Sequence, residues 1–435
     1  MSGEDRTMVS VQVETESASI QDLCRTLGSR ARAASKRLAL ASGGAKNNWL
    51  LRAADSLRDR SAEILEANTI DVAAAPGLGL GSAAIDRLKL NPRRIEEMAK
   101  ALLEVAALPD PIGEVVSSSR RPNGLDVSQV RVPLGVIFMI YESRPNVTVD
   151  AAALCVKSGN AVILRGGKEA IHSNKALHRV LADVLEVSGL PEHAVQLVPT
   201  TDRAAVGGLL GLPEFIDLAI PRGGESLIRR VVAEARMPVM KHYQGICAVY
   251  VDASAEPEMA VRIILNSKAQ RPGVCNAAET LLVHRAIAPR VLPRAARVLG
   301  DAGVELRGDA EARSIVPSMV PASESDWDTE FLDKILAVGV VESIEVAIEH
   351  IGRHGSSHSD AIVTSDFAAA RKFVAEVDSA AVMVNASTRF NDGGQLGLGA
   401  EIGISTDKYH ARGPCGLREL TSTKWIVLGE GQVRE

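Results

Sequence analysis

Aromatic residues are scarce in this sequence, with phenylalanine, tyrosine and tryptophan together making up 3% of the 435 residues. Proteins that hold single-stranded nucleic acid stack its bases on such rings. The 49 basic and 54 acidic residues give a net charge of -5, and the basic ones form no stripe. We therefore expect no nucleic-acid partner.

Cysteine pairs and long apolar runs are also missing. The five cysteines lie far apart and form no C-x-x-C pair, which predicts a reduced chain without structural zinc. The longest apolar run, around residues 136–141, is too short to cross a bilayer. The first residues are polar and lack the apolar segment of a secretory signal. These features favour a cytoplasmic protein with no membrane partner.

What the sequence does contain is a change of periodicity along the chain. We expect a polar tail over residues 1–17 and helices from about 20 to 108, where apolar residues recur three and four positions apart. Asn91 followed by Pro92 predicts the start of one helix. Around Pro122-Asn123-Gly124 the period changes to two, which predicts a hairpin over 113–132.

Strand-like and helix-like runs then alternate, which is typical of parallel sheets covered by helices. The first series of strands is expected at 134–140, 161–165, 195–198, 216–220 and 247–251. The second is expected at 279–284, 303–307, 337–341, 360–364 and 381–385. The fold class is therefore α/β, with one domain over 18–255, a second over 256–385, and a last segment over 386–435. We expect its final strand, 424–428, and the hairpin to form a small β flap completed by another subunit.

No G-x-G-x-x-G sequence follows any expected strand, so the usual dinucleotide fingerprint is absent. The glycines at 77, 79 and 81 follow a helical pattern instead. Two other glycine pairs are better placed at strand ends: one precedes Lys168, and the other is Gly223 with Gly224. Such turns let a phosphate approach backbone N–H groups. The alternative is that both are ordinary strand-to-helix turns.

Several polar residues are candidates for a site. Arg144 and Asn146 follow an apolar strand, and their side chains could bind an anion and donate to an oxyanion, or simply cap a turn. The Gly-rich stretch over 385–401 offers hydroxyl, amide and arginine groups that suit a small zwitterion, or it is a flexible connector. Three histidines spaced four apart, at 350, 354 and 358, are not expected to bind a metal because Gly355 ends the helix.

Cys275 lies on a short loop between a helix-like run and a strand-like run. A small thiol between two rigid elements is well placed to act as a nucleophile. A lone cysteine is nevertheless more often an inert core residue. The choice between a nucleophile and an inert core residue therefore depends on the other motifs of the chain.

Taken together, the sequence resembles the γ-glutamyl phosphate reductase family of the aldehyde dehydrogenase superfamily. The segments that carry the resemblance run in order from about residue 18, and are VPLGVI (132–137), YESRPNVT (141–148), QRPGVCN (270–276), DWDTEFL (326–332), HIGRHGSSHSD (350–360), VNASTRF (384–390) and HARGP (410–414). The resemblance implies an aldehyde dehydrogenase-like fold, with a nicotinamide-nucleotide domain, a catalytic domain and an oligomerisation strand.

The resemblance also implies a role for individual residues. Cys275 matches the catalytic thiol, and Asn146 matches the amide that stabilises the oxyanion together with the backbone N–H of Cys275. The residues implied for the cofactor are Arg165, Lys168, Gly223, Gly224 and Glu330, with Lys168 favouring the 2′-phosphate of NADP. The candidates for holding the substrate are Arg144, Ser387 and Arg389. Lys241-His242-Tyr243 stands near the position where relatives carry the glutamate that activates water.

The implied reaction is the NADPH-dependent reduction of L-glutamate 5-phosphate to L-glutamate 5-semialdehyde through a thioester on Cys275, the second step of proline biosynthesis. No metal is implied. A homo-oligomer is expected, and glutamate 5-kinase, which makes the substrate, is a further expected partner. The alternatives are a reductase that exchanges its thioester with coenzyme A, and a binding protein that kept only the fold.

Overall fold

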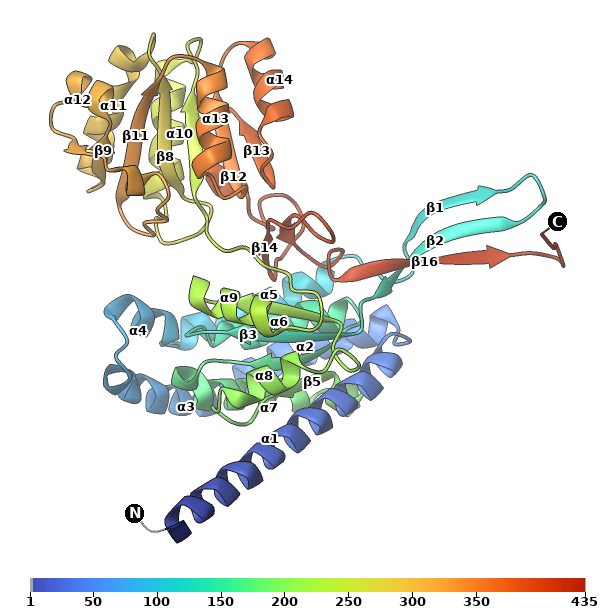
Figure 1. Ribbon diagram of the computed structural model, residues 1–435. Helices are drawn as coiled ribbons and strands as arrows, with labels where there is room; N and C mark the ends of the chain where they lie inside the picture. Colours follow the sequence, from blue (N-terminus) through green and yellow to red (C-terminus); the bar gives the residue numbers. More distant parts are fainter. Residues whose placement is uncertain (1–2, 435) are drawn as a thin grey trace. The chain divides into compact units, whose positions relative to one another are not determined.

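The computed structural model describes residues 3–434, which form two compact units. Unit 1 contains the chain up to Met240, Leu398–Gly403 and the segment from Cys415 on, and unit 2 contains Lys241–Gly397 and Ile404–Pro414. The α/β fold class predicted from the sequence is confirmed, because each unit is built around a parallel sheet with helices on it (Figure 1). Among the described residues, no helix is both long and apolar enough to cross a membrane.

Unit 1 begins with the expected helices. They are α1 (Gly3–Leu38), α2 (Gly43–Asp59), α3 (Ser61–Ala74), α4 (Ser82–Leu88) and α5 (Pro92–Ala107). The predicted helix start is confirmed, because the Asn91 side chain accepts a hydrogen bond from the N–H of Arg94 and Pro92 opens α5. The expected polar tail over residues 1–17 differs from the structure, because the helix α1 already begins at Gly3. Residues 1–2 lie outside the described residues.

The sheet of unit 1 has the order β5-β4-β3-β6, and all its pairs are parallel. Its strands are β3 (Val136–Tyr141), β4 (Ala161–Arg165), β5 (Val195–Leu197) and β6 (Leu218–Arg222). The helices between and after them are α6 (Asn146–Lys157), α7 (Ile171–Asp183), α8 (Ala204–Leu210) and α9 (Glu225–Glu234). The chain builds β3, β4 and β5 outward and then returns to the other side of β3. Ligands bind at such a switch point, beyond the carboxyl ends of the strands.

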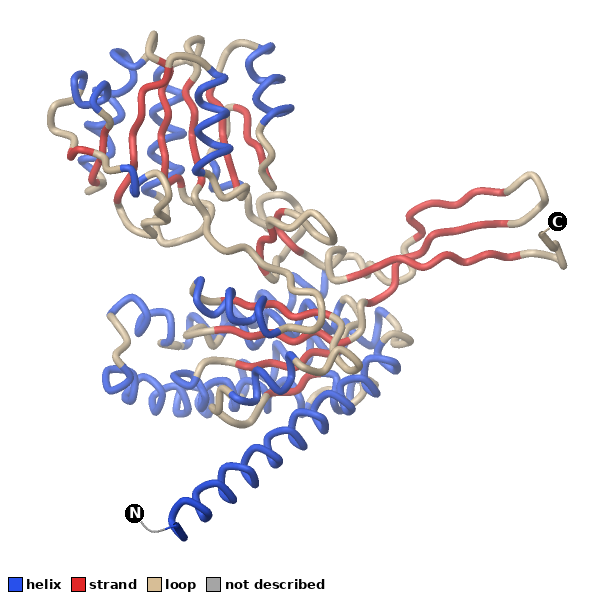
Figure 2. The backbone as a smooth tube through the Cα atoms, in the orientation of Figure 1, coloured by secondary structure: helices blue, strands red, loops and turns tan. Residues whose placement is uncertain are grey.

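A separate three-stranded sheet contains the hairpin predicted from the sequence. It consists of β1 (Val115–Arg120), β2 (Asp126–Pro133) and β16 (Thr421–Leu428), in the order β1-β2-β16 (Figure 2). The last strand therefore pairs with the hairpin of its own chain, antiparallel to β2. Its completion by another subunit stays a prediction.

Unit 2 holds a seven-stranded parallel sheet with the order β10-β9-β11-β8-β7-β12-β13. Its strands are β7 (Cys247–Val251), β8 (Ala278–His284), β9 (Glu305–Gly308), β10 (Val320–Pro321), β11 (Ile335–Val341), β12 (Ser359–Val363) and β13 (Ala381–Val384). Its helices are α10 (Pro257–Ala269), α11 (Ala288–Asp301), α12 (Ala310–Ile315), α13 (Ile344–His354) and α14 (Phe367–Glu376). A short pair, β14 (Gly403–Ser405) and β15 (Gly413–Cys415), precedes β16.

One strand lies in a different sheet from the one expected. The run at 247–251 was assigned to the first series, but it forms β7 and pairs with β8 and β12 in the centre of the second sheet. Unit 2 consequently begins at Lys241 and not near residue 255. Alternation of strands and helices shows that parallel sheets exist. It does not show which sheet a fully buried strand such as β7 joins.

Candidate functional site

Cys275 lies between α10 and β8, on the loop where the sequence places it, and its side chain is partly exposed. The start of β7 holds the backbone of this residue. A methyl group on Gly245 would come within 2.0 Å of the carbonyl oxygen of Cys275, so only glycine fits there. The thiol of Cys247 donates to the same oxygen at 3.1 Å. The nucleophile predicted from the sequence is therefore on a loop fixed by its neighbours.

Two histidines approach the thiol of Cys275. The sulfur and one ring nitrogen each of His242 and His358 all lie within 4.8 Å of one another. The Nδ1 of His242 donates to the carbonyl oxygen of Ile404 at 2.9 Å, because a carbonyl can only accept. Its other nitrogen, Nε2, therefore carries the lone pair.

His358 is more deeply buried than His242. It is fully inaccessible to solvent, its Nδ1 lies 2.7 Å from the hydroxyl of Ser359, and its Nε2 has no hydrogen-bond partner. Burial, with a smaller effect of His242, lowers the pKa of His358 to about 3. His358 therefore stays neutral at physiological pH. As expected, it lies beyond α13, which ends at His354.

Glu330 belongs to the same part of unit 2. Its Oε1 accepts a hydrogen bond of 2.9 Å from the N–H of Gly245, the residue packed against Cys275. Gly245 thus contacts both the Glu330 carboxylate, which the resemblance assigns to the cofactor, and the backbone of the predicted nucleophile, Cys275. That glycine was not identified in the sequence.

A buried ion pair lies beneath the Cys275 loop. Lys268 of α10 and Glu279 of β8 are bonded to each other, and both side chains are fully buried. Burial raises the pKa of Glu279 to about 7 and lowers that of Lys268. The other carboxylate oxygen of Glu279 accepts the N–H of Leu332, two residues after Glu330. The pair thereby connects the segments on both sides of the thiol. Sequence reasoning missed it, because the ten intervening residues carry no sign of the contact.

The two candidates from the Gly-rich loop differ in their environment. Ser387 is buried, and its hydroxyl contacts that of Ser267 and caps the short helix after it, so it has a structural role in unit 2. Arg389 is partly exposed and donates to Gln270 at 2.9 Å. Burial and then the charge of Arg271 lower the pKa of Arg389. Two neighbouring guanidinium groups next to the nucleophile's loop favour an anionic substrate.

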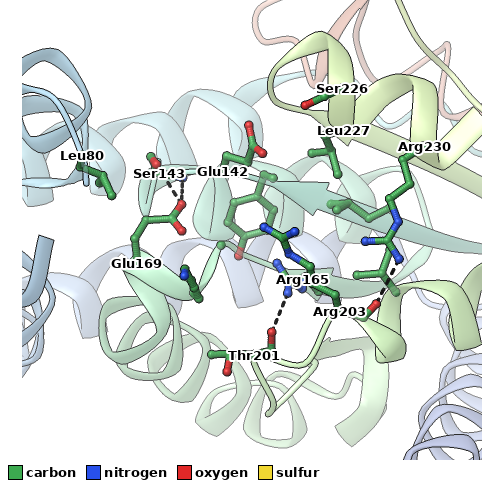
Figure 3. A pocket seen from close by; sticks show the side chains of 15 residues that line it. Leu80, Glu142, Ser143, Arg165, Glu169, Thr201, Arg203, Ser226, Leu227 and Arg230 are labelled. Carbon is green, nitrogen blue, oxygen red and sulfur yellow. Dashed lines mark hydrogen bonds between the residues drawn. The ribbon is translucent and has the colours of Figure 1, made fainter. Parts of the chain in front are cut away.

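Unit 1 contains a cavity of about 410 Å³ at the carboxyl ends of β3 and β4. Arg165, Lys168, Arg203 and Arg230 line it, and Figure 3 shows the guanidinium groups of Arg165, Arg203 and Arg230 close together. Burial, together with the charges of Arg203 and Arg230, lowers the pKa of Arg165. The sequence identified Arg165 and Lys168 but missed the other two arginines, which follow different strands.

Arg165 is held by backbone groups and still keeps one unpaired donor. Its Nη1 donates to the carbonyl of Gly166 at 3.0 Å, and its Nη2 donates to that of Thr201 at 3.1 Å. Its Nε is buried and has no hydrogen-bond partner. An unpaired buried donor among like charges is costly. An anion such as a phosphate would accept a hydrogen bond from this donor and reduce the repulsion between the guanidinium groups.

The glycine pair Gly223 and Gly224 precedes α9, as the sequence suggested. The N–H of Gly224 donates to a carboxylate oxygen of Glu142 at 2.9 Å, and a methyl group on Gly223 would lie 2.4 Å from that same oxygen. A carboxylate thus occupies the position expected for a phosphate of the cofactor. The bound carboxylate shows that the N-terminus of α9 accepts negative charge.

Asn146 and Arg144 are both exposed residues of unit 1. Asn146 opens α6, and its side-chain amide donates to Asp150 at 2.8 Å. Burial raises the pKa of Asp150 to about 6. Asn146 therefore presents an amide whose orientation is set by the carboxylate one turn further along α6.

The comparisons with known proteins agree with these features. The model of the aldehyde dehydrogenase family matches residues 10–311. A gamma-glutamyl phosphate reductase from Rhodopirellula baltica is 56% identical over 431 residues, covering 98% of this chain and 99% of that protein. One from Anaeromyxobacter is 57% identical over 94% of this chain and 97% of its own length.

A solved structure is similar as well. The crystal structure of gamma-glutamyl phosphate reductase from Thermotoga maritima matches with a TM-score of 0.93 and 49% identity, over 95% of this chain and 100% of that one. The resemblance inferred from the sequence is confirmed. This chain belongs to the aldehyde dehydrogenase family and, within it, to the gamma-glutamyl phosphate reductases.

Proposed function

We propose that this protein reduces L-glutamate 5-phosphate to L-glutamate 5-semialdehyde and phosphate, the second step of proline biosynthesis. The observation that carries the proposal is the position of Cys275, a partly exposed thiol on a fixed loop in a chain of this family. The protein is an NADP-dependent oxidoreductase in this proposal. Unit 1 binds the nucleotide and unit 2 provides the nucleophile.

The first chemical step is acyl transfer to sulfur. The Cys275 thiolate attacks the acyl carbon of the substrate, a C–S bond forms, and the C–O bond to phosphate breaks so that phosphate leaves. A reduced nicotinamide, when bound, would supply the hydride that reduces the thioester. The resulting oxyanion re-forms the C=O bond as the C–S bond to Cys275 breaks. This step regenerates the Cys275 thiolate and releases the aldehyde. We assign stabilisation of the oxyanion to the Asn146 amide.

The thiolate requires a base, and His242 fits this task better than His358. The low pKa of His358 makes its imidazole a poor proton acceptor. His242 is partly exposed, and its bond to the Ile404 carbonyl leaves Nε2 as the basic nitrogen. We therefore assign removal of the Cys275 proton to His242, with His358 as a neutral neighbour of the sulfur.

The family uses a nicotinamide cofactor, and the cavity of unit 1 supports NADP as that cofactor. A 2′-phosphate would meet Arg203, Arg230 and the unpaired Nε of Arg165, while Lys168 adds a further positive charge. We assign the pyrophosphate to Gly223 and Gly224, where it would replace the Glu142 carboxylate. We assign Glu330 to the ribose of the nicotinamide.

For the substrate, Arg389 is the strongest candidate for the carboxylate or phosphate, because Arg271 reinforces its charge. Arg144 remains a second candidate, and Ser387 acts by capping the loop that carries Arg389. A homo-oligomer that extends the β1-β2-β16 sheet, an interaction with glutamate 5-kinase, and a cytoplasmic location complete the proposal.

The direct test is the reverse reaction of the purified protein. Glutamate 5-semialdehyde, NADP⁺ and phosphate should give NADPH, and omission of phosphate should stop steady turnover. Coenzyme A offered in place of phosphate should not support turnover. Activity with coenzyme A but not with phosphate would instead favour the thioester-exchanging alternative, and absence of any activity would favour the binding-protein alternative.

A further inference from the structure

His242, Cys275 and His358 form a set of potential metal ligands around the predicted nucleophile. One ligand atom from each lies within 4.8 Å of the other two, and among the described residues this is the one such group of three or more. A thiolate and two imidazoles are ligands that Zn²⁺ prefers, and three protein ligands with an open fourth position are typical of accessible zinc sites. The partial exposure of Cys275 provides that opening.

Both imidazoles make a hydrogen bond through Nδ1, and hydrogen bonds of this kind orient histidines that bind metals. The Nδ1–H of His242 donates to the Ile404 carbonyl at 2.9 Å, and Nδ1 of His358 lies 2.7 Å from the Ser359 hydroxyl. That hydroxyl also accepts from the amide of Asn391 at 2.7 Å, which fixes its position. A ligand histidine is usually held in this way through the nitrogen that does not bind the metal.

The Nε2 of His358 is the second, independent sign of a ligand. It is buried and has no hydrogen-bond partner, in a side chain with no exposed surface. An unsatisfied buried nitrogen costs free energy. A metal ion bound to this nitrogen would remove that cost. The buried thiol of Cys247 is directed at the carbonyl of Cys275, so the fourth position of such an ion would be left to water.

We propose that His242, Cys275 and His358 bind one Zn²⁺ ion reversibly, and that the bound ion blocks the enzyme by occupying its nucleophile. Zinc displaces the proton of the Cys275 thiol, which passes to solvent, and a Zn–S bond forms without any change of oxidation state. The ion is an inhibitor and not a cofactor, because the thiolate it binds is the group that must attack the acyl phosphate. The inhibitory consequence depends on the proposed function, whereas the binding of the metal does not.

Titration of the full-length protein with Co²⁺ under reducing, anaerobic conditions tests the site directly. Cobalt bound to a thiolate gives a sulfur-to-metal charge-transfer band, so the wild type should show this band with one equivalent of Co²⁺, and Zn²⁺ should displace it. Cys275→Ser should abolish the band. His242→Gln and His358→Gln should each weaken binding by roughly tenfold or more.

Two matched variants control for general effects. Cys155→Ala removes a buried thiol of unit 1, and His350→Gln removes an imidazole of α13 outside the group; both should bind Co²⁺ like the wild type. Circular dichroism checks folding. If His358→Gln does not fold, the partly exposed His242→Gln decides. A band of unchanged affinity in His242→Gln, or no band in the wild type, would overturn the proposal.

Inhibition is measured separately. Micromolar Zn²⁺ should stop turnover of the wild type, a chelator should restore it, and any activity left in His358→Gln should need more Zn²⁺ for the same inhibition. A protein that shows the cobalt band but no reductase activity would retain the metal site and contradict the proposed function. A reductase that shows no band would retain the function and contradict the metal site.

Discussion

The cavity of unit 1 and the thiol site of unit 2 are built on opposite principles. In the cavity, like charges gather: Arg203 and Arg230 both lower the pKa of Arg165, and one donor of Arg165 is buried and unpaired, although Arg230 also pairs with Glu234. Around Cys275, by contrast, most polar groups are tied to fixed partners, as the buried pair of Lys268 and Glu279 shows. Excess charge is suited to binding an anion that comes and goes, and fixed partners are suited to holding a reactive group in place.

The largest expected effect separates the two sites most clearly. Cys275→Ala should abolish reduction because no other described thiol is both near this position and partly exposed. The dissociation constant for NADPH should remain unchanged, since the Cys275 thiol is assigned to the substrate and not to the nucleotide. Steady-state rates and fluorescence titration measure the two quantities, with Cys155→Ala as the control. Retained turnover in Cys275→Ala would contradict the assignment.

Lys268→Met tests whether the fixed partners in unit 2 support the fold. Removing one member of a buried ion pair leaves an uncompensated charge and should destabilise the protein by about 3–5 kcal/mol. The double variant with Glu279→Gln keeps an acceptor for the Leu332 N–H and should recover most of this loss. Denaturant unfolding followed by circular dichroism measures the loss of stability. Equal stability of the single and double variants would show that the pair has no such role.

Asn146→Ala tests the oxyanion assignment. Loss of such a donor should lower kcat by roughly 100- to 1000-fold. The affinity for NADPH should not change. Asp150→Asn, which keeps the Asn146 amide but alters its partner, should have a much smaller effect. A reduction of less than tenfold in Asn146→Ala would remove this residue from the chemical step.

Arg203→Ala and Arg230→Ala test the charge excess of the cavity. Each removes a charged hydrogen-bond donor worth roughly 1.5–3 kcal/mol, so the dissociation constant for NADPH should rise about 10- to 100-fold. That for NADH should change little, because NADH has no 2′-phosphate. Arg229→Ala is the matched control, because Arg229 lies on the same helix and pairs with Glu225 as Arg230 pairs with Glu234, but it does not line the cavity. Equal losses for NADPH and NADH would show that these arginines do not recognise the 2′-phosphate.

The smallest effect concerns the pH dependence of stability in unit 2. Burial raises the pKa of Asp360 from its ordinary value of 3.8 to about 6. The folded state therefore holds this proton more tightly than the unfolded state, and the resulting stability is complete below about pH 4 and is lost as the pH rises through 6. Asp360→Asn mimics the protonated form.

Denaturant unfolding at pH 5 and pH 8 measures this effect. The wild type should lose roughly 1–3 kcal/mol more between these values than Asp360→Asn. Asp301→Asn, an exposed change on α11, should behave like the wild type. An identical pH dependence of Asp360→Asn and the wild type would show that Asp360 does not titrate in this range.

Much of this arrangement could be predicted from the sequence, because its signals are local. The cap at Asn91, the hairpin and every strand of the two sheets except the short β10 follow from periodicity and turn residues within a few positions. The resemblance supplied Cys275 for the same reason, since its loop is a continuous motif. The two arginines Arg203 and Arg230 carried no local signal, because only the folding of unit 1 brings them to Arg165.

The environment of Cys275 shows the same limit. His242 and His358 are separated from it by tens of residues, and parallel strands β7, β8 and β12 bring the three together. The assignment of β7 to the wrong sheet hid this contact, since His242 leads directly into that strand. Contacts between distant segments depend on strand order, which periodicity does not contain.

The most direct test of the central claim is to trap the acyl group on sulfur. The protein is mixed with glutamate 5-semialdehyde and NADP⁺ in the absence of phosphate, and NADPH formation and the mass of the Cys275 peptide are followed together. We predict a burst of one NADPH per chain, a glutamyl group on Cys275, and its release when phosphate is added. A burst without modification of Cys275, or a modified Cys275 that phosphate does not discharge, would contradict the account.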